Sequence, residues 1–352
     1  MRHILLPVNL SHHLSNIARA DAALRSQLAF GLDAPAAPDT VRLAEFVAAA
    51  FGPAAAAVIH YGSHAQHSGA RPESAHDFFV IVGRYAEAYR ALHAAVGTRF
   101  APATAALLAR VLPPNVLRLV APLTPRALHA KCAVLSLRDL ERACSARAKD
   151  HFAQGRLFQQ VQLVWARDAA SRDAVTDALV AARARTFAWG RPFLPTRFDV
   201  DRYCRVLLET SFAAEIRPEK GDRIPQLLAA QRDTLRHIYG ALLEHLAATS
   251  IVVREGNVYR QRAPVNAAER MRVRLYFARS MARSTARWSK YVALYDNWLD
   301  YIVQKIARRT GVAVELTERE RRWPLIFLWP RAIQFVRTRP QRQDAERTAG
   351  RG

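Results

Sequence analysis

The chain has 352 residues, 51% of them hydrophobic, which is enough for one large domain or two smaller ones with a sizeable core. Its 52 basic and 30 acidic residues give a net charge of +22. Such a charge attracts nucleotides, nucleic acid and anionic membranes, although an arginine-rich, solvated surface would give the same total. No apolar run reaches the roughly 18 residues of a membrane-spanning helix. The apolar region within Met1–Asn9 is shorter than the one that a secretory signal requires. Cys132, Cys144 and Cys204 lack metal-binding spacing, which predicts ordinary thiols in a reducing compartment.

Residues 10–50 predict a helix, a loop and a second helix. Leu14, Ile17 and Leu24 begin one apolar face, and Val41 and Phe46 belong to another. Prolines between the two groups separate the helices.

Residues 57–82 predict a strand, a turn and a second strand. The first strand ends at Gly62–Ser63, and the second begins directly after Asp77. Gly62 allows close approach of a ligand, Ser63 offers a hydroxyl, and a helix starting there would point its N–H groups at an anion. Asp77 is suited to binding a metal that neutralises phosphates. A plain Gly-Ser turn followed by an Asp cap is the structural alternative.

Residues 84–167 continue the alternation of helices and strands. Helices are predicted over residues 84–112 and 137–158, and strands over Lys131–Ser136 and Val161–Trp165. Lys131 stands at the start of its strand, where it is either a phosphate ligand or simply solvated. This part therefore predicts an α/β or α+β domain over residues 1–167.

From residue 168 the pattern is mostly helical, and we expect a helical domain over residues 168–320. Its clearest helix runs through Leu227, Leu235 and Leu243. Residues 269–310 combine many arginines with aromatic residues, which predicts either a single-stranded nucleic acid site or a helix with a packed aromatic face and a solvated basic one.

Residues 321–352 form a basic, aromatic tail. The segment Trp323–Trp329 is apolar with flanking arginines, as an interfacial membrane segment requires, and it is too short to span a bilayer. We expect this tail to bind an anionic membrane surface; a buried C-terminal element is the alternative.

Several blocks, in order, resemble the mitochondrial-type phosphatidate cytidylyltransferases, the translocator assembly and maintenance family of the nucleotidyltransferase superfamily. The blocks are Tyr61-Gly62-Ser63, Asp77-Phe78-Phe79-Val80-Ile81-Val82, Lys131-Cys132-Ala133-Val134-Leu135-Ser136, Gly155-Arg156-Leu157, Ser211-Phe212-Ala213-Ala214-Glu215-Ile216-Arg217, and Arg236 with Tyr239-Gly240. Phe79 stands where the superfamily usually has a second carboxylate, and Glu215 replaces the family's Asp.

The resemblance implies an α+β fold, in which a nucleotidyltransferase-like mixed sheet with helices is followed by a mostly helical C-terminal domain. It also implies transfer of a cytidylyl group from CTP to phosphatidic acid, giving CDP-diacylglycerol and pyrophosphate. It implies that Asp77 and Glu215 bind Mg²⁺, and we expect these two carboxylates to lie within metal-bridging distance. Gly62 and Ser63 would bind the nucleotide, and Lys131 and Arg217 would offset charge on the leaving pyrophosphate.

Such an enzyme would be cytoplasmic and peripheral on the inner membrane face in a bacterial-like chain, or on the matrix side in a mitochondrion. The alternative function is a degenerate nucleotidyltransferase-like protein that binds RNA or nucleotide without catalysis.

Overall fold

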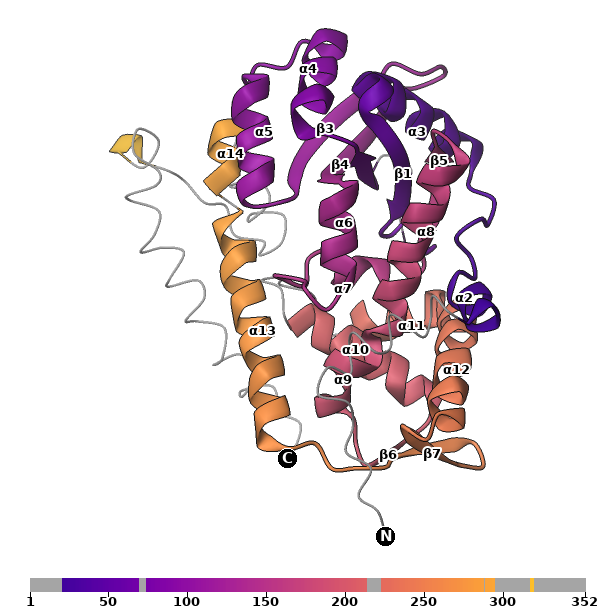
Figure 1. The fold of residues 1–352 in the computed structure, drawn as a ribbon. Coiled ribbons are helices and arrows are strands. Elements are labelled where there is room, and N and C mark those ends of the chain that lie inside the picture. The colour runs from indigo at the N-terminus through magenta and orange to yellow at the C-terminus, as the bar shows by residue number, and fades with distance from the viewer. Residues whose placement is uncertain (1–20, 70–73, 214–222, 288, 295–316, 320–352) are drawn as a thin grey trace. The chain divides into compact units, whose positions relative to one another are not determined.

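The computed structural model of the chain describes residues 21–69, 74–213, 223–287, 289–294 and 317–319 (Figure 1). The chain divides into two compact units, residues 1–290 and 291–352. Both sheets lie in the first unit. The domain boundary predicted after residue 167 falls inside this unit, at the start of a helix.

A five-stranded mixed sheet forms the centre of the first part of the chain. Its strands are β1 (Ala55–Tyr61), β2 (His76–Val82), β3 (Asn115–Ala121), β4 (Leu128–Ser136) and β5 (Gln162–Ala166), in the order β3-β4-β2-β1-β5. The β2–β4 pair is parallel and the other pairs are antiparallel. Strands β1 and β2 are buried along nearly their whole length, in agreement with their continuous apolar sequences.

Helices cover both faces of this sheet. The face with Ile59 and Phe79 forms one core with α6 (Leu137–Cys144), α7 (Gln154–Leu157) and α8 (Ala169–Ala184). On the other face α3 (Pro38–Phe51) contacts all five strands, and its Thr40 meets His76. The 3₁₀ turn Gly52–Ala54 leads from α3 into β1, while α4 (Tyr85–Val96) and α5 (Pro102–Val111) connect β2 to β3.

The later part of the first unit is mostly helical. A second core joins α2 (Ala22–Leu28), α10 (Val200–Ala213), α11 (Arg223–Ala230) and α12 (Arg232–Ala248). The short α9 (Thr186–Gly190) and the 3₁₀ turn Arg191–Phe193 precede α10. The predicted α+β fold, with a mixed sheet and helices followed by a helical region, is thus confirmed. The single helix predicted through Leu227 and Leu243 is two helices, separated at Gln231.

A small sheet of three strands was not predicted. It consists of β6 (Arg197–Phe198), β7 (Val252–Glu255) and β8 (Val258–Gln261), in the order β6-β8-β7. Strands of two to four residues give too short an alternation to be recognised in a sequence.

The helix α13 (Ala267–Ala286) carries much of the basic, aromatic sequence. Phe277 packs against the second core, and the Tyr276 hydroxyl donates to the Asp150 carbonyl at 3.1 Å. Arg272 and Arg279 are exposed. The prediction of a packed aromatic face and a solvated basic one is therefore confirmed for this helix. The chain continues into α14 (Ser289–Leu294), and no helix among the described residues is long and apolar enough to cross a membrane.

Candidate functional site

Asp77 and Lys131 lie side by side at one end of the five-stranded sheet. They are register partners near the starts of the parallel strands β2 and β4, and Lys131 Nζ donates to Asp77 Oδ1 at 3.1 Å. The side chains are 24% and 44% exposed respectively, so both are open to solvent. The Asp77 carboxylate raises the pKa of Lys131 well above its ordinary value, against the effect of burial, and the ammonium stays charged at neutral pH.

Gly62 follows β1 directly beside the Asp77 carboxylate. Its φ is +81°, and a Cβ added to it would lie 2.7 Å from Asp77 Oδ2. Glycine is the residue that adopts this conformation at low cost and leaves the space empty. The space beside Gly62 is thus bordered by the Asp77 carboxylate, and the approach of a ligand to Gly62 stays a prediction.

No helix begins at Ser63. The helix N-terminus that would have pointed its N–H groups at an anion is therefore absent at this position. Residues 63–69 are turns, in which the amides of Gln66 and Ser68 donate to the carbonyls of Gly62 and Ser63, both at 3.0 Å. His67 adopts a φ of 51°, in the left-handed region, which prevents a helix from continuing. Ser63 is half-buried at the start of these turns.

A layer of glutamines connects the 63–69 turns to the helical region. Gln66 Nε2 and Gln231 Nε2 both donate to Gln159 Oε1 at 3.1 Å. Gln160 Nε2 donates to the Ala65 carbonyl at 3.0 Å. The side chains of Gln66, Gln159 and Gln231 are buried, so the turn is fixed by hydrogen bonds that water does not weaken.

Three histidines lie at the same end of the sheet, around the face opposite Asp77. The rings of His64 and His76 stack at 4.0 Å, and those of His60 and His76 are 5.4 Å apart. Burial lowers the pKa of His60 and of His76 to about 4, so both are neutral at pH 7. The described residues contain no group of three or more side chains arranged to hold a metal ion, and these stacked rings are no exception. The cluster has no signal in the sequence, because it depends on the pairing of β1 with β2.

Phe79, which stands where a second carboxylate would be expected, is fully buried. Its ring meets the Phe152 ring edge-on at 6.2 Å, and the Arg156 guanidinium lies 3.9 Å from the centre of the Phe152 ring. Arg156 also opposes the raised pKa of Lys131, which places positive charge near the Asp77–Lys131 pair. Phe79 is therefore part of an aromatic layer, and the Arg156 guanidinium lies over the Phe152 ring of that layer.

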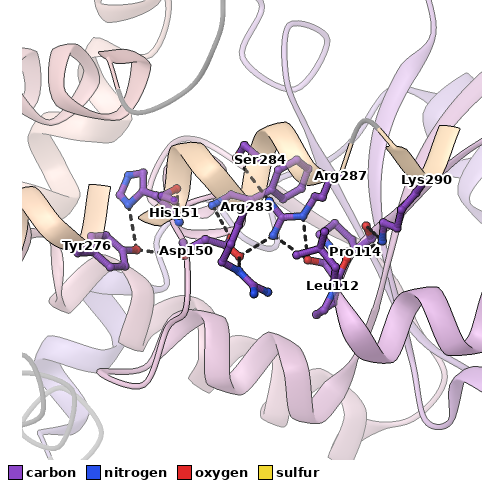
Figure 2. Close-up of polar contacts among 12 residues, drawn as sticks. Leu112, Pro114, Asp150, His151, Tyr276, Arg283, Ser284, Arg287 and Lys290 are labelled. Carbon is purple, nitrogen blue, oxygen red and sulfur yellow. Dashed lines mark hydrogen bonds and ion pairs between the residues drawn. The ribbon is translucent and has the colours of Figure 1, made fainter. Parts of the chain in front are cut away.

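Asp150 binds two arginines at the C-terminal end of α13 (Figure 2). Its Oδ2 accepts from Arg283 Nε at 2.8 Å and from Arg287 Nη2 at 2.6 Å. Burial raises the pKa of Asp150, but Arg287 and Arg283 outweigh it and hold the pKa below the ordinary value. The Arg287 guanidinium also lies 4.9 Å from the centre of the Phe152 ring. This network, which sequence analysis missed, fixes α13 against the surroundings of the Asp77 site.

Lys290 extends the same network to the end of α5 (Figure 2). Its Nζ donates to the carbonyls of Leu112 and Pro114 at 2.5 and 2.8 Å and to Asn115 Oδ1 at 2.7 Å. Burial and the charge of Arg287 lower the pKa of Lys290 to about 7, whereas the oxygen acceptors stabilise the charged form. Lys290 is therefore a buried residue whose ammonium group bonds to the end of α5 and the start of β3, and it is not exposed to solvent.

Two further blocks of the family resemblance meet at His151. Its Nε2 contacts Ser211 Oγ at 2.8 Å, and its backbone N–H donates to Ser280 Oγ at 2.9 Å. A Cβ added to Gly155 would lie 2.9 Å from the His151 ring and 3.8 Å from the Ser211 Cβ. The start of the Ser211–Arg217 block therefore packs against the Gly155–Leu157 block.

Glu215 and Arg217 lie outside the described residues, as does the Trp323–Trp329 segment. The described residues bordering the 214–222 segment contact parts of the site: Ser211 lies at Gly155, and Arg223 Nη1 donates to the Ser68 carbonyl at 3.0 Å. Asp77 is a partly exposed carboxylate of the kind that Mg²⁺ prefers, and Mg²⁺ commonly uses one or two carboxylates together with substrate phosphates. The donor chemistry at Asp77 fits this ion, provided that Lys131 gives up its contact with Oδ1.

No protein-family model matches the chain, and a comparison with curated proteins gives no match.

Proposed function

We propose that the protein transfers a cytidylyl group from CTP to phosphatidic acid, giving CDP-diacylglycerol and pyrophosphate. The observation that carries the proposal is the meeting of Gly62, Asp77 and Lys131 at one end of the sheet. These three residues come from three separate blocks of the resemblance. If the blocks form one site, the fold must bring these residues together.

The residues have distinct roles in this proposal. Gly62 and Ser63 bind the nucleotide phosphates, and Lys131 and Arg217 balance the charge of the departing pyrophosphate. Asp77, together with Glu215, would hold Mg²⁺, which would neutralise charge on the phosphates. A phosphate oxygen of the lipid forms the new bond to the α-phosphorus, while the bond from the α-phosphorus to the bridging oxygen of the β-phosphate breaks. Positioning and electrostatics are sufficient for this step, without a covalent intermediate.

The alternative is a nucleotidyltransferase-like protein that binds nucleotide or RNA without catalysis. The Lys131–Asp77 contact favours it, because this ion pair occupies a carboxylate oxygen that a metal would need. The buried Phe79 favours it as well, since it removes the usual second carboxylate.

The experiment is an incubation of the purified protein with CTP labelled at the α-phosphate, Mg²⁺ and vesicles containing phosphatidic acid, with the labelled lipid separated and counted. Asp77→Asn should abolish product while CTP binding persists, because the variant removes a negative charge beside the phosphates. Asp173→Asn, the same change at an exposed position of α8, is the control and should retain activity. CTP binding without labelled lipid in the unmodified protein would favour the non-catalytic alternative, and an unchanged rate in Asp77→Asn would remove this residue from the mechanism.

A further inference from the structure

The outer face of α13 has an apolar crest. Met271 and Leu275 are 54% and 62% exposed, and Ala278, one turn further along, is exposed as well. Residues spaced by three and four lie on one side of a helix, so these three form a continuous line. Large apolar side chains that are exposed in such a line, instead of singly, indicate an interaction surface.

Arginines border this crest on both sides. At 100° per residue, Arg272 and Arg279 project to one side of the crest and Arg270 and Arg274 to the other. All four are exposed, and among the described residues no carboxylate pairs with them. The acidic residue of the helix, Glu269, is held on the inner side by Arg191 Nη1 at 2.7 Å. The outer face is therefore apolar along its centre and uniformly cationic at its borders.

The inner side of α13 is fixed, so the helix cannot turn to cover this face. Arg283 and Arg287 bind Asp150, and Ser280 Oγ accepts from the His151 backbone. The aromatic rings of Tyr276 and Phe277 are also directed inward. Bases of single-stranded nucleic acid stack on exposed aromatic rings, and this face presents none among its described residues.

We infer that the outer face of α13 binds a membrane surface that contains anionic lipids. The Met271–Leu275–Ala278 crest enters the interface, and the bordering arginines contact lipid phosphates. The inference rests on the proposed function and deepens it, because a lipid acceptor requires a membrane, and it assigns the docking to residues of α13. The inner side of the same helix holds Asp150, next to the Phe152–Arg156 layer that borders the Asp77 site.

The first test is sedimentation of the full chain with vesicles of equal parts phosphatidylcholine and phosphatidylglycerol, and with vesicles of phosphatidylcholine alone. The chain should bind the anionic vesicles, and Arg272→Glu with Arg279→Glu should weaken binding at least about tenfold, from the contribution of each basic residue near such a surface. Arg90→Glu with Arg118→Glu makes the same change of charge on α4 and β3 and should have little effect. Equal losses in the two double variants would show that net charge alone drives binding and would overturn the inference.

The second test distinguishes insertion of the crest from electrostatic attraction. Because all three cysteines are buried, a cysteine introduced as Leu275→Cys can be labelled selectively with an environment-sensitive fluorophore. Its emission should shift to the blue on addition of anionic vesicles, whereas the same label at Arg118→Cys should not respond. Met271→Ser with Leu275→Ser should lower vesicle binding by about tenfold, with the thermal melting curve as a check of folding.

A labelled single-stranded RNA is the competing ligand in the same experiments. An absent blue shift would overturn the inference, because the crest would then stay outside the membrane. RNA binding that depends on Arg272 and Arg279, while vesicle binding does not, would also overturn it and would assign the face to nucleic acid. Neither measurement depends on cytidylyl transfer, so an inactive protein that still binds vesicles through α13 would refute the proposed function alone.

Discussion

Lys131 and Asp77, 54 residues apart in the chain, are direct partners across the parallel β2–β4 pair, and their side chains join at 3.1 Å. An ion pair that is partly open to solvent contributes little to stability, about 1 kcal/mol or less. Its position beside Gly62 and near the charge of Arg156 is therefore in line with the proposed ligand site. Any cation that binds Asp77 must displace or share the contact with Lys131.

Replacement of Lys131 should separate activity from stability. We expect Lys131→Met to lower kcat/KM for CTP by about 100-fold, because one preorganised charge on the departing phosphates contributes roughly this factor. The free energy of unfolding should change by less than about 1 kcal/mol, since the pair is partly exposed. The labelled-CTP assay and urea denaturation measure the two quantities. Lys149→Met, at an exposed position, serves as the control, and a large loss of stability in Lys131→Met would mean that the pair is structural.

Two glycines of one segment allow a matched test of the space beside Asp77. Gly62 and Gly69 have φ values of +81° and +76°, but an added Cβ meets Asp77 Oδ2 at 2.7 Å in the first case and nothing within 4 Å in the second. Both Gly62→Ala and Gly69→Ala should cost about 1 kcal/mol of stability from the left-handed backbone. Gly62→Ala alone should weaken CTP binding, by at least about tenfold, because the methyl group, and the Asp77 carboxylate that it displaces, take up space that the phosphates need. Isothermal titration with CTP checks this, and equal affinities of the two variants would show that the space at Gly62 is not used.

The strands around Asp77 and Lys131 were predictable because each rests on a local pattern: a short apolar run bounded by turn residues predicts a strand. The meeting of Asp77 with Lys131 was not predicted, because it requires β2 and β4 to be adjacent and parallel. The Asp150 network gave no such signal. Asp150 belongs to a loop, and its partners Arg283 and Arg287 follow more than 130 residues later, among many other arginines of α13. Only the packing of that helix selects these two for burial and leaves Arg272 and Arg279 in solvent.

The 63–69 turns illustrate a different limit. Gly62–Ser63 was compatible with a helix start, and the local sequence did not exclude it. The structure instead fixes these residues through Gln66, Gln159 and Gln231, whose side chains come from three parts of the chain. Tertiary hydrogen bonds therefore decided a backbone conformation that local preference left open.

The buried histidines should make the protein sensitive to mild acid. His60 and His76 have folded pKa values of about 4 and an ordinary value of 6.5. Between these pH values the unfolded chain binds more protons than the folded one, so the free energy of unfolding should fall as the pH decreases from 6.5 to 4. Each group contributes on the order of 3 kcal/mol to this fall. His60→Gln should make the pH dependence shallower, whereas His93→Gln, at an exposed position of α4, should leave it unchanged. Urea denaturation at a series of pH values gives the slopes, and the same slope in all three proteins would contradict the assignment.

The Asp150 carboxylate should be among the most important polar groups for stability. Its side chain is 11% exposed, and Asp150→Asn would leave Arg283 and Arg287 beside a neutral group in a buried place. Breaking a buried pair in this way costs about 3 kcal/mol or more, because the remaining charges are not compensated. Asp177→Asn breaks the Arg25–Asp177 pair, which is of similar length at 2.9 Å but has side chains that are 35% and 40% exposed. It should cost about 1 kcal/mol at most.

Chemical denaturation at pH 7 compares these two variants directly. The pKa of Asp150 is held below its ordinary value of 3.8, so the contribution of this carboxylate is fully present above that pH and is lost only as the pH falls further. The difference between Asp150→Asn and the unmodified protein should therefore be constant across the range in which His60 and His76 titrate. If Asp150→Asn were no more destabilising than Asp177→Asn, the attachment of α13 would depend on the packing of Phe277 and Val273, and the network would contribute orientation without stability.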